Sequence, residues 1–290
     1  MNTELTQKLD DSLSFYKTSR LNRLLKSPNR LLYSTLISAA NNKLTMAVPA
    51  KATTFFEEEM KVILPEIVST TIYRYGFFEE GLTTFMLNYL KPEMIFFDVG
   101  THFGFFSLLG SHLVGKNGQV HSFEPTKSTF ELLKENTKDK ENIVLTNKAV
   151  WSDEATLSFN DYGLRNSAFN SVYTSRWIQK AKFKTYDVKA LSIDSYIRNT
   201  GLAPNFIKID AESSEYKILK GMERTLTEIK PIVTIEVGDM GVEGAVSTRE
   251  LITYMVDKGY QALEFKDGKI KNHVICDKYD YNNLCFIPNP

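Results

Sequence analysis

From about residue 92 onward, short hydrophobic runs alternate with stretches of helical periodicity. Runs rich in Ile, Val and Phe are typical of buried strands, and most of them precede an amphipathic stretch. The runs lie at residues 94–99, 119–124, 142–147, 205–210 and 232–237. The amphipathic stretches lie at residues 105–113, 128–137, 192–198, 213–220 and 247–257. This alternation predicts right-handed βαβ units and a mainly parallel sheet.

Further signals complete this part of the chain. Ser128, with Glu131 three residues on, is expected to open its helix as a capping box. Four more short strands are predicted at residues 156–159, 186–192, 260–265 and 282–287. The polar stretch 160–185 is expected to be a long loop, either a lid or wall for an acceptor or a mobile surface loop. Its candidate contact residues are Arg165, Asn166, Ser167, Tyr173, Arg176 and Trp177.

The chain before residue 92 has a different pattern. Residues 1–57 predict a helical extension with a break near Ser27-Pro28-Asn29, and basic residues there are interleaved with leucines. This extension is interpreted as a cap on the main domain or as a surface for an anionic membrane or a lipid-linked substrate. Residues 58–91 predict two short strands around Pro65 and a helix from Glu79 to Leu90. Tyr73, Tyr75 and Phe77 would then share one strand face, in the pocket or in the core.

Composition narrows the function classes. Lys and Arg number 35 and Asp and Glu also number 35, so no basic excess suggests a nucleic-acid partner. The two cysteines cannot form a disulfide framework, and no CxxC pair suggests zinc. The first twenty residues lack the apolar core of a secretory signal, and no run is long enough to span a membrane. We expect a cytoplasmic protein, with peripheral membrane association left open.

The segment MIFFDVGTHFGFFSLLG carries the strongest chemical signal. A hydrophobic strand ends in Asp98, turns through Gly100 and Gly104, and continues into a helix. Ligands of such folds bind at the carboxyl ends of the strands, where glycine allows close approach and a helix start offers free N–H groups. The spacing is not that of the dinucleotide fingerprint, because residues 101–103 crowd the place of the middle glycine. S-adenosylmethionine, which has no pyrophosphate, fits this turn better.

A second signal follows at the end of the next strand. Glu124 can accept hydrogen bonds from both hydroxyls of a ribose. Asn147 and Ala149, after the third strand, can face an adenine, whereas Trp151 is expected to be a packing residue. The alternative is a tight structural turn followed by a solvated glutamate.

Seven segments together resemble the FkbM family of S-adenosylmethionine-dependent methyltransferases. They occur in the family's order over about residues 92–240, and the KIDxE block is the most specific. The segments are FFDVGTHFGFFSLL, FEPTKSTFELLKEN, NKAVWSDEATLSF, NSAFNSV, VKALSIDSYI, FIKIDAESSEYKILKG and PIVTIEVG. One departure is Ser213, where members of the family usually have glycine; it is expected to cap the next helix or to narrow the acceptor pocket.

The resemblance implies a fold, a cofactor and an activity. It implies a Rossmann-like α/β methyltransferase fold over residues 92–290, with a mainly parallel seven-stranded sheet, an antiparallel C-terminal strand and helices on both faces. It also implies an O-methyltransferase that acts on a hydroxyl of a sugar, a glycoconjugate or a related natural product, with S-adenosylhomocysteine as product. The cofactor-binding residues would be Asp98, Gly100, Thr101, His102, Gly104, Glu124, Asn147, Ala149 and Asp210.

Methyl transfer to an alcohol benefits from a general base, and four residues are candidates. They are Asp210, Glu212, Glu236 and His102. Asp210 and Glu212 would share a face and Glu236 would approach the same mouth, whereas His102 has the ordinary pKa closest to neutrality. Three of them have a structural alternative: orienting Lys208 or capping the next helix for Asp210, a supporting partner for Glu236 and a cofactor cover for His102. The three carboxylates could also hold a divalent cation, which is not expected without histidine ligands.

Two other readings of the same residues remain. A nicotinamide-dependent oxidoreductase would share the sheet and Glu124, but the glycine spacing disfavours it. A non-catalytic module that binds S-adenosylmethionine is the other alternative, and only Ser213 favours it. The expected partner is a small-molecule, sugar or glycolipid acceptor, with no nucleic acid and no transmembrane segment.

Overall fold

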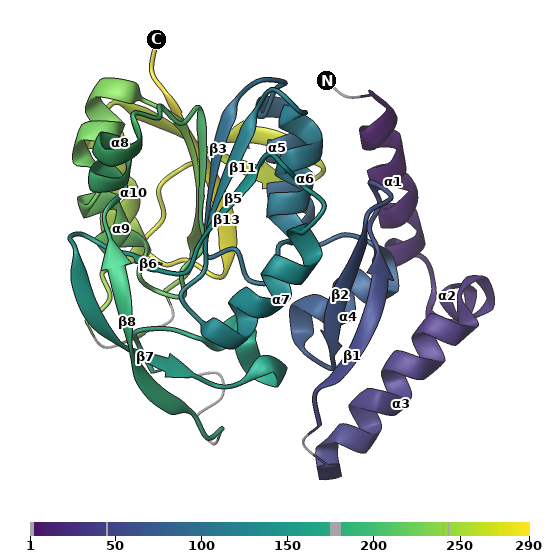
Figure 1. The fold of residues 1–290 in the computed structure, drawn as a ribbon. Coiled ribbons are helices and arrows are strands. Elements are labelled where there is room, and N and C mark those ends of the chain that lie inside the picture. Colours follow the sequence, from purple (N-terminus) through teal and green to yellow (C-terminus); the bar gives the residue numbers. More distant parts are fainter. Residues whose placement is uncertain (1–2, 45, 175–180, 240, 243) are drawn as a thin grey trace.

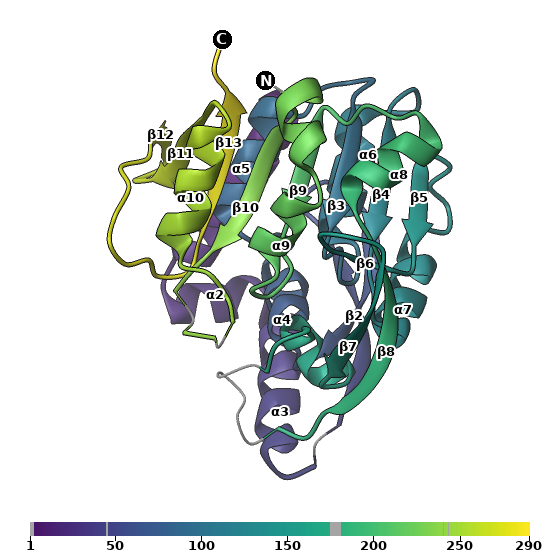
Figure 2. The same ribbon diagram turned by 90° about the vertical axis from the view of Figure 1, so that its left-hand side faces the viewer.

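The computed structural model describes residues 3–44, 46–174, 181–239, 241–242 and 244–290. Of residues 41–44 it describes the backbone. Its centre is an eight-stranded sheet with the order β12-β11-β13-β10-β9-β3-β4-β5, and Figure 2 shows these strands side by side. The strands are β3 (Ile95–Val99), β4 (Gln119–Phe123), β5 (Ile143–Thr146), β9 (Phe206–Ile209), β10 (Ile232–Val237), β11 (Tyr260–Lys266), β12 (Lys269–Asn272) and β13 (Asn282–Pro288).

The strand directions confirm the predicted Rossmann-like α/β fold. β5, β4, β3, β9 and β10 are parallel, and β13 runs antiparallel between β10 and β11. The predicted count of seven strands is one too low, because β12 folds back on β11 as a hairpin. Asp267 and Gly268 connect the two strands with φ of 55° and 73°, the backbone of a tight two-residue hairpin turn.

Helices cover both faces of the sheet (Figure 1). α5 (Glu80–Tyr89) and α6 (Phe105–Val114) bury their apolar sides in one core, and α8 (Ile193–Thr200), α9 (Glu215–Lys220) and α10 (Thr248–Asp257) bury theirs in the other. A short π-helix, Thr225–Ile229, follows α9. α7 (Lys127–Thr137) begins one residue before Ser128, after Thr126, so the predicted Ser128 cap is wrong. No helix in the described residues is long and apolar enough to cross a bilayer.

The N-terminal part packs against the first of these cores. It contains α1 (Thr3–Lys17), α2 (Arg20–Lys26), α3 (Pro28–Leu44) and the hairpin of β1 (Val48–Thr53) and β2 (Glu59–Leu64). Leu5, Leu9 and Leu13 recur every four residues on α1 and are buried among side chains of α5 and α6. α1 is therefore a cap on the main domain.

The segment after Pro65 is a helix, and the predicted second strand there is wrong. α4 (Ile67–Tyr75) begins at Glu66, whose carboxylate accepts hydrogen bonds from the backbone N–H groups of Val68 and Ser69 at 3.0 and 2.6 Å. The helix ends at Gly76, with φ of 76°. Both caps outweigh the β-branched composition of the segment. The three aromatic residues at 73, 75 and 77 therefore share no strand face.

A second, smaller sheet lies beside the carboxyl ends of the central strands. It has the order β6-β8-β7 and consists of β6 (Ala149–Val150), β7 (Ala155–Asp161) and β8 (Lys184–Leu191). The predicted strands at 156–159 and 186–192 are thus present, but they lie outside the central sheet. The 3-10 helix η1 (Leu164–Phe169) follows β7 and contacts β2, α4 and α7.

Candidate active site

A cavity of about 580 Å³ opens at the carboxyl ends of β3, β4, β9 and β10. Its opposite wall comes from β2, α4 and η1, so the N-terminal part of the chain closes one side. The lining includes Gly100, Thr101, His102, Glu124 and Ala149. A volume between roughly 300 and 1,000 Å³ is typical of small-molecule sites.

Three of the predicted cofactor contacts lie behind the cavity wall. Among the described residues, Asp98, Gly104 and Asn147 do not contribute to the lining. Asn147 donates to the backbone carbonyls of Glu124 and Pro125, at 2.8 and 3.1 Å. In this geometry the three residues shape the wall, and their contact with the cofactor stays a prediction.

The glycines of the turn are required by the protein's own packing. Gly100 has φ of 74°, and a Cβ there would lie 1.6 Å from the carbonyl oxygen of Asp210. Gly104 has φ of 97°, and a Cβ there would lie 2.7 Å from Cδ1 of Leu133. The sequence argument assigned these glycines to close approach of a ligand, whereas the structure shows close approach of β9 and α7.

Lys208 holds the ends of β3 and β9 together. Its ammonium lies 3.3 Å from Oδ1 of Asp98 and 3.4 Å from Oδ2 of Asp210, and it donates to the carbonyl of Gly100 at 3.2 Å. Ser107 donates to the other oxygen of Asp98 at 2.7 Å. Burial alone would lower the pKa of Lys208, but the surrounding carboxylates outweigh it and hold that pKa above its usual value. The lysine is therefore a buried ammonium at neutral pH.

Glu124 joins the glycine turn to the start of α7. Its Oε2 accepts from the backbone N–H of His102 at 3.1 Å, and its Oε1 accepts from that of Thr126 at 2.9 Å. Burial raises the pKa of Glu124 to about 7. Each carboxylate oxygen has a second lone pair, so the side chain can still accept hydrogen bonds from hydroxyls in the cavity.

Asp210, Glu212 and Glu236, here called the carboxylate cluster, meet in the wall of the cavity. Each offers an oxygen within 4.8 Å of the other two, which confirms that β9 and β10 bring them together. Burial and the neighbouring Asp210 raise the pKa of both Glu212 and Glu236 well above the usual range. Carboxylate oxygens suit a divalent cation, and they equally suit hydrogen bonds to hydroxyls.

His102 has a different environment from the one expected. Its Nε2 lies 2.7 Å from Oγ of Ser167 in η1, and its ring lies against that of Phe103. Burial, followed by the charge of Lys208, lowers the pKa of His102 to about 3. The argument from a pKa near neutrality is therefore wrong, and the neutral ring connects the turn to η1.

Sequence reasoning named Lys208 only as a group that Asp210 orients, and it missed Glu79 and Tyr281. A lysine between two isoleucines of a buried strand is itself a signal, since it needs a charged partner. Glu79 and Tyr281, 202 residues apart, both line the cavity, and Tyr281 donates a hydrogen bond to Glu79. Burial and the nearby Asp210 raise the pKa of Glu79 to about 7. No local pattern could have paired these two side chains.

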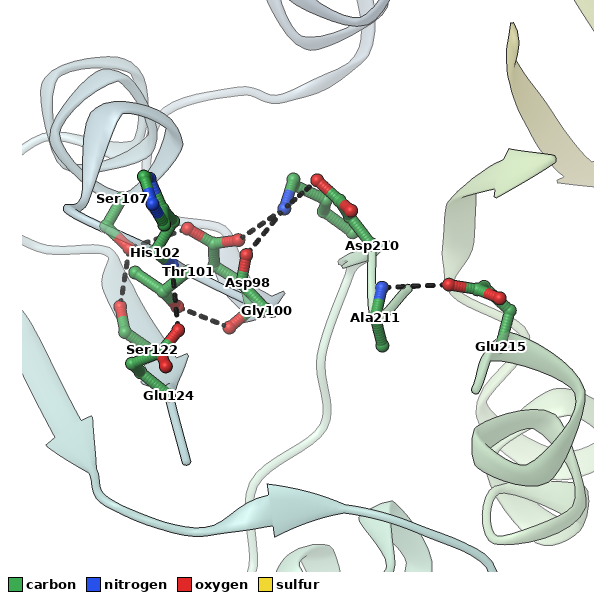
Figure 3. Close-up of polar contacts among 11 residues, drawn as sticks. Asp98, Gly100, Thr101, His102, Ser107, Ser122, Glu124, Asp210, Ala211 and Glu215 are labelled. Carbon is green, nitrogen blue, oxygen red and sulfur yellow. Dashed lines mark hydrogen bonds and ion pairs between the residues drawn. The ribbon is translucent and has the colours of Figure 1, made fainter. Parts of the chain in front are cut away.

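Ser213, where members of the family usually have glycine, lies in the turn between β9 and α9. Ser213 has φ of 78°, a left-handed conformation that favours glycine. The residue before α9 is Ser214, and no side-chain cap bond forms there, so the predicted Ser213 cap is wrong. Glu215 accepts from the backbone N–H of Ala211 at 2.8 Å and secures this turn instead (Figure 3).

The loop 160–185 contributes to the cavity through η1. Ser167 lies in the lining, and so do Phe169 and Asn170, whereas among the described residues Arg165 and Tyr173 do not. Asn166 lies within η1, also outside the lining. Arg176 and Trp177 lie outside the described residues.

The sheet order and the strand-end cavity define a Rossmann-like α/β protein of the methyltransferase type. The family model for the methyltransferase FkbM domain matches residues 98–262, more than half of the chain. The chain belongs to this family, as the sequence resemblance predicted.

Two relatives and one solved structure illustrate the similarity. The hexuronic acid methyltransferase AglP of Haloferax volcanii is 24% identical over 53% of this chain, and the match spans 61% of that relative. The 31-O-demethyl-FK506 methyltransferase FkbM of Streptomyces tacrolimicus is 26% identical over 61% of this chain and 76% of its own length. The crystal structure of methyltransferase FkbM from Methylobacillus flagellatus KT is 18% identical, with a TM-score of 0.42, and covers 75% of this chain and 52% of that one.

Proposed function

We propose that this methyltransferase transfers the methyl group of S-adenosylmethionine to a hydroxyl oxygen of a small acceptor that contains a sugar or a related polyol. The observation that carries this proposal is the single cavity that joins Glu124 at one end to the carboxylate cluster at the other. A nucleoside-type ligand fits the first end, and an alcohol fits the second.

The residues at the first end suit the cofactor. Glu124 offers two acceptor oxygens for the ribose hydroxyls. Pro125, Ala149 and Trp151 provide largely apolar surface for the adenine. Asp210 also lines the cavity, and its side chain is 25% exposed. When bound, the cofactor supplies a methyl group already activated by a positively charged sulfur.

The residues at the second end suit an acceptor with both polar and apolar parts. The carboxylate cluster faces the cavity on one side, and Met60, Val68 and Ile72 face it on the other. One relative is named for a hexuronic acid, a sugar with both hydroxyls and a carboxylate, and the other for 31-O-demethyl-FK506, a name that agrees with a hydroxyl acceptor. A sugar joined to an apolar body would use both walls.

Proton removal is assigned to Asp210. It alone in the cluster has an ammonium within ion-pair distance, that of Lys208 at 3.4 Å, among the described residues. Burial and the neighbouring Asp210 raise the pKa values of Glu212 and Glu236, which favours the protonated forms that can donate hydrogen bonds to the acceptor. Asp210 would take the proton of the acceptor hydroxyl, and the bound cofactor would supply the methyl group and leave as S-adenosylhomocysteine. Much of the acceleration then comes from positioning.

Calorimetric titration tests the cofactor assignment. We expect S-adenosylhomocysteine to bind and NADH not to bind, with affinity reduced about tenfold or more in Glu124→Gln, which loses a charge-assisted acceptor. Glu154→Gln, at an exposed position, is the matched control and binds as the wild type does. Binding of NADH alone would support the oxidoreductase alternative instead.

Transfer of a labelled methyl group tests the reaction. Hexuronic acids and glycolipids with a free hydroxyl are the first acceptors to try, and Asp210→Asn is expected to lower turnover by about 10²-fold or more. Full turnover in Asp210→Asn would remove this residue as the base. Cofactor binding without transfer to any acceptor would favour a non-catalytic module.

A further inference from the structure

The N-terminal helices carry a strong charge asymmetry in a chain that is balanced overall. Between Asp11 and Glu57 the sequence contains no acidic residue. The same interval contains seven basic residues: Lys17, Arg20, Arg23, Lys26, Arg30, Lys43 and Lys51. Arg20, Lys26 and Arg30 are exposed, and within the described part of the chain they form no ion pair. This surface therefore carries uncompensated positive charge.

Leucines are exposed on the same two helices. Leu21 and Leu25 of α2, one turn apart, are 66% and 71% exposed. Leu32 and Leu36 of α3, also one turn apart, are 52% and 67% exposed. A single exposed leucine is ordinary, but clustered ones on adjacent helices mark an interaction surface.

Contacts on the inner side hold this surface in place. Arg23 donates to the hydroxyl of Tyr75 at 2.9 Å, and Nε of Arg74 donates to Ser34 at 2.7 Å. Both bonds join the helices to α4. α2 and α3 pack against each other and lie on the outer side of the β1–β2 hairpin, away from the central sheet (Figure 1). The basic and leucine side chains therefore belong to a fixed outer face.

We propose that α2 and α3 dock the protein on an anionic lipid surface. Leucine side chains would enter the boundary between headgroups and acyl chains, while the arginines and lysines pair with anionic headgroups. A nucleic acid would use the charge and leave the leucines in water. A second copy of the chain would bring the leucines together and also bring two positive surfaces into contact.

The docked face would lie one helix away from the cavity. α4 contacts α3, and its residues Ile67, Val68 and Thr71 line the cavity wall. Ile67 is 61% exposed at the rim. The docking proposal depends on this surface and not on the proposed function. Docking through α2 and α3 would bring the side of the cavity that α4 lines close to molecules held in the membrane.

Vesicle co-sedimentation of the full chain tests the proposal. We expect binding to phosphatidylcholine vesicles that contain phosphatidylserine, weaker binding without phosphatidylserine, and release by salt. The triple variant Arg20→Gln, Lys26→Gln, Arg30→Gln should lower the partition coefficient by about fivefold per charge removed. The triple variant Leu21→Gln, Leu25→Gln, Leu36→Gln should lower it by about tenfold or more.

The control carries equivalent changes on the far side of the chain. Lys266→Gln, Lys269→Gln and Val274→Gln alter exposed residues near the C-terminal hairpin and should leave binding unchanged. Circular dichroism confirms that each variant is folded. Absence of vesicle binding by the wild type would overturn the proposal. A leucine variant that binds vesicles like the wild type would also overturn it, because the surface would then be a general polyanion site. A wild-type dimer that does not bind vesicles, and that the leucine substitutions dissociate, would show that the surface binds a second copy of the chain instead.

Discussion

Replacement of Lys208 by methionine is the most direct test of how the active site is held together. Lys208 is 2% exposed, and Asp98 beside it is fully buried at 0%. Methionine keeps most of the volume of the lysine stem but removes the ammonium that lies 3.3 Å from Asp98. The substitution leaves a carboxylate in the interior with Ser107 as its remaining hydrogen-bond donor in the described residues.

The expected loss follows from that uncompensated charge. Breaking a buried ion pair on one side typically costs about 3–5 kcal/mol. The double variant Lys208→Met, Asp98→Asn should recover much of this loss, because asparagine is neutral and its oxygen can still accept from Ser107. Since the pKa of Lys208 is raised, its stabilising effect is fully present at neutral pH and is lost only at strongly alkaline pH.

Urea unfolding followed by circular dichroism provides the measurement. Lys134→Met is the matched control, because Lys134 pairs with Glu131 at 3.2 Å on an exposed helix surface, where about 0–1 kcal/mol is at stake. A loss no larger than that of the control, or a double variant Lys208→Met, Asp98→Asn that is no more stable than Lys208→Met alone, would refute the reasoning.

Three other predictions rest on the same structure. Gly100→Ala should lower the free energy of unfolding by more than about 3 kcal/mol, because the strain of a left-handed backbone adds to an overlap with the Asp210 carbonyl. Gly259→Ala, with φ of 84° and no neighbour within 4 Å, is the control and should lower it by about 1–2 kcal/mol in the same urea assay. Equal losses would contradict this account. Burial raises the pKa of Glu66 from 4.5 to about 7, so between these pH values the native protein holds a proton that the unfolded chain releases. The free energy of unfolding should therefore fall as the pH rises from 4.5 to about 7. Glu66→Gln should make this dependence weaker when unfolding is measured over a pH series. Turnover should stay within about twofold when EDTA is added, because the ammonium of Lys208 lies beside Asp210 and burial disfavours the charged forms of Glu212 and Glu236; a large loss that Mg²⁺ restores would show a cation there.

The strand and helix order was available from the sequence because it depends on local pattern. Strands covered on both faces are largely apolar runs, as in Ile95–Val99 and Ile232–Val237, and the intervening helices show their own periodicity. The family resemblance and the positions of Glu124 and Asp210 at strand ends follow from the same local information. These features need no knowledge of which strands become neighbours.

Two predictions were wrong although local sequence signals indicate the observed structure: the number of strands in the central sheet and the strand after Pro65. Asp267-Gly268 between alternating residues is a strong hairpin signal, and it produces β12. Glu66 and Gly76 bracket a helix, yet the β-branched residues between them suggested a strand. In both cases the backbone requirements of a turn or a cap outweighed residue propensity.

The chemistry of the site was decided by tertiary structure. Parallel pairing of β3 with β9 places Asp98 opposite Lys208, and no spacing along the chain predicts that register. The same approach of strands puts the carbonyl of Asp210 against Gly100, which explains the glycine independently of any ligand. Burial then shifts the pKa of His102 down and that of Glu124 up. Sequence determines which groups are available, but their charge depends on the neighbours and the exclusion of water that only folding supplies.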